Sequence, residues 1–180
     1  MSRAKNIAFL GIMLGIIVVL SWLEFMLSAV LLLPPHIKLG LANIVIMYCV
    51  IFVGKKPAIM LGVLKSLFVF LTRSPMAGLL SFCGGVLSVL MIILLAAVFR
   101  DKVSYVGLSV AGAVVHNLGQ LFVVAVLFGG GVFLAYLPVM VIAGVAAGVV
   151  TGVLLKVTLP VLAAVGMNCG RPDVHGRGEL

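Results

Sequence analysis

Eight polar side chains lie within or beside long apolar runs, and their types suit the binding of a small solute. Glu24 and Lys65 are charged residues inside such runs, while His116, Asn117 and Gln120 are spaced so that one face of a helix carries all three. If the runs cross a membrane, a charge at a helix centre costs about 2.5–3.5 kcal/mol, so these groups are expected to face a bundle interior or cavity. The candidate set is Glu24, Lys38, Asn43, Lys65, Arg73, His116, Asn117 and Gln120. Because its cations outnumber its one anion, the set favours an anionic or polar solute.

A purely structural interpretation of the same residues stays open. Lys38 and Arg73 are cations whose long side chains can reach lipid head groups. Glu24 and Lys65 suit an ion pair between two helices, and the His–Asn–Gln cluster suits hydrogen bonds between helices. One shared cavity accounts for all of these groups at once, and we therefore prefer it.

The composition requires that most of the chain lie in lipid. Of the 180 residues, 64% are apolar and 9% are charged, whereas soluble domains have about 45–50% apolar and about 25% charged residues. A globule of this length cannot hide so much apolar surface from water. The composition therefore excludes a soluble enzyme, a disordered chain and a nucleic-acid-binding module, and we expect no nucleic-acid partner.

The apolar runs predict an all-α integral membrane protein, a bundle of six transmembrane helices in a single domain over residues 1–160. The expected helices cover about residues 7–33, 39–53, 57–72, 79–99, 103–128 and 132–159. A span needs about 20 residues, so the second and third runs are short. Four spans plus a re-entrant pair buried in protein are the alternative. Residues 161–180 predict a polar, flexible cytoplasmic tail.

The basic residues predict the orientation of these spans. With six spans and both ends inside, nine of the twelve Lys and Arg residues lie on the inner side. Lys38 and Arg73 then lie on the outer side, and Lys65 lies within a span. Positive charge concentrates in cytoplasmic loops, so we expect a multi-pass membrane protein with both termini in the cytoplasm. The candidate site then forms a cavity that opens outward.

Two stripes of small residues predict close helix packing. The first consists of Ala4, Ala8, Gly11 and Gly15. The second consists of Gly144, Gly148 and Gly152. Small residues let helix backbones approach closely in lipid. We expect the second stripe to pack inside the protein and the first to dock a partner membrane protein.

The sequence contains no catalytic motif that we recognise. It has no P-loop, HExxH or GxSxG pattern, and its only aspartates, Asp101 and Asp173, cannot form an Asp-rich site for a Mg²⁺–diphosphate group. The three cysteines lack a CxxC spacing, so we expect neither a zinc site nor a disulfide framework. The protein is therefore expected not to be an enzyme and to need no metal or other cofactor.

Three segments resemble one family of bacterial membrane proteins. They are residues 37–43 (IKLGLAN), 81–88 (SFCGGVLS) and 112–121 (GAVVHNLGQL). Over about residues 5–160 the chain resembles the Gx transporter family, which is also labelled heptaprenyl diphosphate synthase component I. That family is similar to the S-components of energy-coupling-factor (ECF) transporters, which are six-helix proteins of the bacterial cytoplasmic membrane that capture vitamins or their precursors.

The resemblance implies that partner proteins drive transport. S-components associate with a transmembrane coupling protein and two ATPases, and their first helix docks through small residues, commonly alanines four apart. Ala4 and Ala8 match that pattern, and Gly11 and Gly15 extend it. Nickel and cobalt S-components carry a histidine directly after the first Met, and Ser2 in that place argues against metal uptake.

The sequence therefore predicts the substrate-binding subunit of a bacterial uptake transporter for a small anionic or polar solute, such as a vitamin or precursor. The alternative is a non-catalytic membrane accessory subunit of isoprenoid or heptaprenyl diphosphate (quinone) synthesis. A third interpretation, a structural membrane subunit of a redox complex, predicts no ligand.

Overall fold

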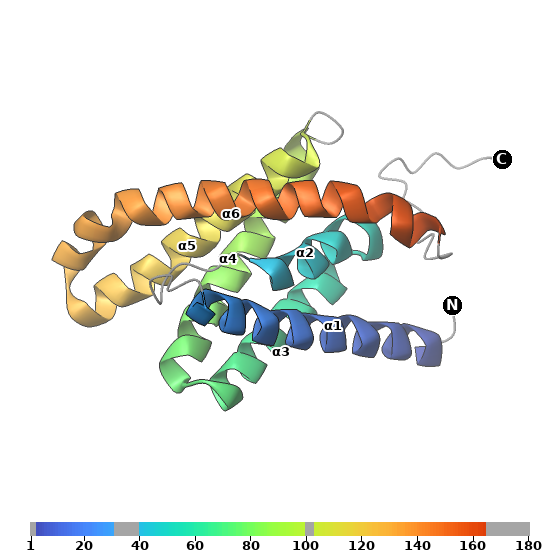
Figure 1. Cartoon of the computed structure of the whole chain (residues 1–180), viewed down its shortest axis with the longest axis horizontal. Coiled ribbons are helices and arrows are strands. Elements are labelled where there is room, and N and C mark those ends of the chain that lie inside the picture. Colours follow the sequence, from blue (N-terminus) through green and yellow to red (C-terminus); the bar gives the residue numbers. More distant parts are fainter. Residues whose placement is uncertain (1–2, 31–39, 100–102, 165–180) are drawn as a thin grey trace.

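The computed structural model describes residues 3–30, 40–99 and 103–164 of the chain. They form helices α1 (Arg3–Val30), α2 (Leu41–Tyr48), α3 (Lys55–Thr72), α4 (Pro75–Phe99), α5 (Tyr105–Phe128) and α6 (Gly130–Ala164), with a π-helical turn, η1 (Cys49–Val53), directly after α2 (Figure 1). This part of the chain contains no strand. The prediction of an all-α protein is thus confirmed.

Four of these helices are long and apolar enough to cross a membrane, namely residues 7–28 of α1, and α4, α5 and α6. The segment Leu41–Val53, which comprises α2 and η1, is apolar but shorter. At 1.5 Å per residue it reaches about 20 Å, whereas the hydrocarbon core of a bilayer is about 30 Å thick. Helix α3 has 18 residues, three of which are lysines. Length and composition alone therefore support four spans.

Several helix ends differ from the ends of the apolar runs. Helix α1 begins at Arg3, before the expected start at residue 7. Helix α6 continues to Ala164, so residues 161–164 of the expected tail are helical. An apolar run marks the part of a helix that suits lipid, whereas backbone hydrogen bonding continues into polar surroundings. The rest of the tail, from residue 165, lies outside the described residues.

The helices pack mainly in chain order, and α2 lies inside the molecule. Helix α1 packs against α2 and α3, α3 packs on α4, α4 on α5 and α5 on α6, while α2 also reaches α6. Figure 1 shows α2 between α1 and α6, with the first turn of α1 and the last turn of α6 at the same end of the molecule. Residues 45–50 of α2 and η1 are all buried and belong to the hydrophobic core. This short segment is therefore surrounded by protein.

Glycines bring α5 and α6 into close contact. The second small-residue stripe faces a row of valines on α5, and a Cβ atom added to these glycines would lie 2.4–2.9 Å from a valine Cα atom. The pairs are Gly144 with Val114, Gly148 with Val110, and Gly152 with Val106. Carbon atoms in ordinary contact are about 3.5–4.0 Å apart, so a larger residue does not fit. The prediction that this stripe packs inside the protein is confirmed.

Two connections depend on backbone conformations that favour glycine. Gly54, between η1 and α3, has a φ of 137°, and Gly129, between α5 and α6, has a φ of 100°. Helix α5 begins after Ser104, whose Oγ accepts a hydrogen bond from the Gly107 N–H at 3.1 Å, as an N-cap does. These local signals fix where α3, α5 and α6 begin and where α5 ends.

Candidate functional site: a polar cavity between the helices

A polar cavity lies where all six helices converge. Its volume is about 30 Å³. A cavity needs about 10–15 Å³ by this measure to hold one water molecule, so the space accommodates about two. The lining residues are Ser21, Glu24, Gly40, Asn43, Lys65, Val69, Arg73, Ser81, Ala113, His116, Asn117 and Ala147.

Glu24 connects α1 to the beginning of α2. Its side chain is buried, and its Oε1 accepts a hydrogen bond of 2.5 Å from the Gly40 N–H. Gly40 precedes α2 with a φ of 78°, and its carbonyl accepts a hydrogen bond from the Asn43 N–H. The unpaired N–H groups and the dipole of a helix N-terminus favour a carboxylate. Backbone groups therefore hold Glu24 at the cavity wall.

Arg73 directly follows α3, and its side chain turns onto α1. Its Nη2 donates a hydrogen bond of 2.6 Å to the Ser21 carbonyl, and its Cζ lies 4.6 Å from the centre of the Phe25 ring. Such a cation–π contact contributes about 0.5–2 kcal/mol. Burial lowers the pKa of Arg73 from its ordinary value, and attraction to Glu24 acts in the opposite direction. A guanidinium remains charged in proteins, so Arg73 is a cation at the cavity wall.

Lys65 brings a second cation into the cavity from α3. Its Nζ donates a hydrogen bond of 2.7 Å to the Asn43 Oδ1 of α2. Lys65, Val69 and Arg73 are spaced by four residues, so one face of α3 and its C-terminal end supplies all three lining residues. The periodicity of α3 therefore explains why both cations reach the same cavity.

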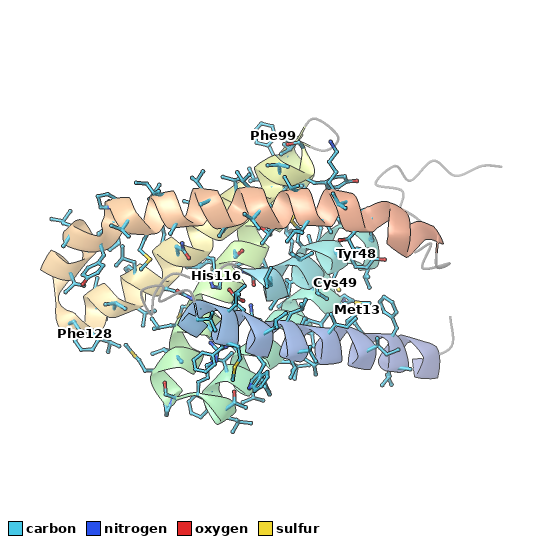
Figure 2. All side chains as sticks on the ribbon, viewed as in Figure 1. Met13, Tyr48, Cys49, Phe99, His116 and Phe128 are labelled. Carbon is cyan, nitrogen blue, oxygen red and sulfur yellow. The ribbon has the colours of Figure 1, made fainter. Side chains whose placement is uncertain are left out.

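Helix α5 supplies an imidazole and two amides, and one of the amides also connects two helices. His116, Asn117 and Gln120 are all buried. The Asn117 Nδ2 donates to the Met140 carbonyl of α6 at 3.0 Å, and the Gln120 Nε2 is hydrogen-bonded to the His116 Nε2 at 3.0 Å. The Asn117 amide thus stabilises the contact of α5 with α6 and also lines the cavity. Figure 2 shows His116 within the bundle, far from Phe128 at the end of α5.

Two further cavities adjoin these residues. One, of about 20 Å³, shares Gly40 and Asn43 with the polar cavity and is lined by the hydroxyl groups of Ser88, Ser109 and Thr151. The Ser109 Oγ and Thr151 Oγ1 atoms are hydrogen-bonded at 2.5 Å. The other is larger, about 320 Å³, and mostly apolar. Its lining residues, from α4, α5 and α6, are Leu80, Gln120, Leu121, Val124, Phe128, Val132, Tyr136 and Met140.

The structure brings six of the eight predicted site residues to the polar cavity. They are Glu24, Asn43, Lys65, Arg73, His116 and Asn117. Gln120 is on the same side of α5 but lines the apolar cavity, because it lies one turn beyond His116. Lys38 lies outside the described residues. Within the described chain, no group of three His, Cys, Asp or Glu residues could hold a metal ion.

The predicted docking stripe lies on the outer side of α1. Ala8, Gly11 and Gly15 are exposed, and a Cβ atom on either glycine would meet nothing within 4 Å. Ala4 belongs to the same helix, but its side chain lies outside the described residues. At 100° per residue the stripe lies opposite Met13 and Ile17, through which α1 enters the core. The stripe is therefore not used for packing within the described chain.

Two serines of the cavity were missed in the sequence. Ser21 lies three residues before Glu24, so the helical period places both on one face of α1. Ser81 begins one of the segments that carry the family resemblance, and it lines the polar cavity without being among the predicted site residues. Apolar runs tolerate serine at little cost, which is why neither residue stood out. The helical spacing from Glu24 would have found Ser21.

Comparison with protein families gives a match to most of the helical region. The family model for heptaprenyl diphosphate synthase component I matches residues 13–158. The chain belongs to this family. The match covers every residue that lines the polar cavity, from Ser21 to Ala147. No curated protein and no solved structure gave a match to the chain.

Proposed function

We propose that this member of the heptaprenyl diphosphate synthase component I family is the solute-binding subunit of an uptake system. Its solute is small and anionic or polar, such as a vitamin or precursor. The observation that carries the proposal is an excess of positive charge, because Lys65 and Arg73 face Glu24 alone among the charged residues described at the cavity. Lys65 and Arg73 are half-buried, charges withdrawn from water favour a counter-charge, and ionisable residues among membrane helices mark substrate sites. An anionic group of the solute would balance the charge.

The cavity must widen to admit such a solute, because ligand pockets occupy about 300–1,000 Å³. Helix α1 is the element best placed to move, since it packs mainly on α2 and α3 and forms one wall of the cavity. Two hydrogen bonds hold that wall, from Arg73 to the Ser21 carbonyl and from the Gly40 N–H to Glu24. A tilt of α1 that breaks them would open the site.

In the proposed arrangement the chain is S-component-like, with six spans in the bacterial cytoplasmic membrane and both termini in the cytoplasm. The excess of Lys and Arg on one side supports this orientation. The common position of the first turn of α1 and the last turn of α6 is consistent with an even number of spans (Figure 1). The cavity end near Glu24 and Arg73 then faces outward.

The proposed subunit is not an enzyme and depends on partners for energy. The exposed stripe of Ala8, Gly11 and Gly15 offers a smooth surface on the outer side of α1. Small residues of this kind allow close contact with another membrane helix. A transmembrane coupling protein, associated with ATPase subunits, is the partner that this proposal requires.

A second candidate function follows from the family description, an accessory and non-catalytic role in heptaprenyl diphosphate synthesis. The apolar cavity of about 320 Å³ favours it, because a prenyl chain needs an apolar channel. The polar cavity alone does not explain that role. The two candidates differ in the partner that should co-purify, an ATPase complex or a prenyl synthase.

The test is to identify small molecules that remain bound to the full-length protein after purification, by mass spectrometry of the extracted solutes. We expect wild type to carry an anionic or polar solute that Lys65→Met loses by about tenfold or more. Lys56→Met is the matched control, because Lys56 is exposed at the start of α3. Equal solute content in Lys65→Met and wild type, or no solute in either, would contradict the proposal.

A further inference from the structure

Ser21 carries a buried hydroxyl group that makes no hydrogen bond within the described part of the chain. Its side chain is 3% exposed, and it lines the polar cavity. Most buried polar atoms in proteins have a partner, and one without a partner destabilises the empty state. The hydroxyl group of Ser21 is therefore a donor that residues 3–30, 40–99 and 103–164 do not use.

Other hydroxyl groups of the helices behave differently. Ser66, Thr72 and Thr158 each donate to the carbonyl four residues earlier in their own helix, at 2.7–2.9 Å. This arrangement is the usual one for serine and threonine within helices. Ser21 departs from it, although its helix continues on both sides. Its hydroxyl group can therefore donate a hydrogen bond to a ligand in the cavity.

Two cations line the same cavity as this hydroxyl group. The Arg73 guanidinium bonds to the carbonyl of Ser21 itself, and Lys65 lines the same cavity. A guanidinium has five N–H donors, of which the Ser21 carbonyl takes one. Glu24 lines the same cavity and attracts the Arg73 guanidinium, while its Oε1 accepts the Gly40 N–H. Among the described residues, two cations and the Ser21 hydroxyl group therefore share the cavity with one carboxylate.

We propose that Ser21, Arg73 and Lys65 form an oxyanion subsite, in which the Ser21 hydroxyl group donates a hydrogen bond to a carboxylate or phosphate group of the solute. Arginine matches the geometry of both groups, and several acceptor lone pairs on one oxyanion satisfy several donors. This inference rests on the proposed function and deepens it, since it specifies which chemical group of the solute the cavity binds. Ser21 is a binding residue in this account.

The experiment uses full-length protein in detergent and measures how acetate and inorganic phosphate raise the unfolding midpoint at constant ionic strength. Acetamide, which has the shape of acetate without its charge, is the neutral probe. We expect either anion to stabilise wild type, and Ser21→Ala to need about tenfold or more anion for the same shift, because hydrogen bonds to charged groups are the stronger ones. Ser66→Ala is the matched control, since its hydroxyl group is buried but bonded within α3.

The unliganded variants separate binding from folding. Ser21→Ala removes a buried donor that has no partner among the residues the structure describes, so its midpoint without anion should equal or exceed that of wild type. Equal anion response of Ser21→Ala and wild type would overturn the role of Ser21, while the proposed function stands. Equal responses to acetamide and acetate, or no response to either anion, would overturn the oxyanion subsite. The solutes extracted from the purified protein decide the proposed function separately.

Discussion

Gly148 offers the sharpest prediction about how the helices are held together. A Cβ atom at this position would lie 2.4 Å from the Val110 Cα, 2.9 Å from the Val110 nitrogen and 3.0 Å from the Ser109 carbonyl oxygen. All three are backbone atoms of α5, so no change of rotamer can make room. In Gly148→Ala the two helices must separate by about 1 Å to restore ordinary contact distances.

The cost of this separation is that of overpacking, about 1–3 kcal/mol and occasionally more. We take about 3 kcal/mol, because the clash involves backbone on both helices. For a chain of this length, each kcal/mol lowers the unfolding midpoint by about 2–4 °C, so we expect a fall of about 6–12 °C. The neighbouring bond between Ser109 and Thr151 should weaken as well, because it spans the same two helices.

A thiol-reactive dye provides the assay, because Cys49 is fully buried and reacts only when the protein unfolds. Cys83→Ala and Cys169→Ala remove the other thiols in all samples. Gly15→Ala is the matched control, since its Cβ atom meets nothing within 4 Å and alanine favours a helix by about 1 kcal/mol over glycine. Its midpoint should stay the same or rise. Equal midpoints for Gly148→Ala and Gly15→Ala would refute the packing argument.

Three further predictions concern the cavity and the docking surface. Glu24→Gln keeps an acceptor for the Gly40 N–H but removes the negative charge, so acetate should stabilise it at about two- to tenfold lower concentration than wild type, measured by thermal unfolding. Asn117→Ala loses its bond to the Met140 carbonyl and should lower the unfolding midpoint by a few degrees, since such bonds contribute about 0.6–2 kcal/mol. Gly11→Leu should abolish co-purification with a coupling protein while its response to acetate stays unchanged; retained co-purification would exclude this face of α1 as the docking surface.

The convergence of the charged residues was predictable from the sequence, because a charged side chain within an apolar helix avoids lipid and faces the bundle interior or a cavity. Glu24 and Lys65 interrupt apolar runs, so they were expected to gather with other polar groups inside the bundle, and both line the polar cavity. The eight-residue spacing of Lys65 and Arg73, about two helical turns, likewise places both on one side of α3. What the pattern could not show is the role of each contact, such as the hydrogen bond from the Gly40 N–H to Glu24.

The limits of the prediction follow from the same physics. Gln120 shares a helix side with His116, but one turn along α5 separates two cavities of different character. Ser21 escaped notice because serine costs little in an apolar helix, and only the folded chain distinguishes a serine that bonds to its own helix from one that does not. The helix ends differ from the ends of the apolar runs. An apolar run indicates which residues suit lipid, whereas a helix extends as far as its backbone hydrogen bonds continue.

A structure of the protein with its bound solute is the most direct test of the central claim. We expect an anionic group of the solute within hydrogen-bonding distance of the Lys65 and Arg73 side chains, with α1 displaced from its contact at the Ser21 carbonyl. A solute held in the apolar cavity beside Tyr136, with Lys65 and Arg73 unchanged, would contradict the account and favour the role in heptaprenyl diphosphate synthesis.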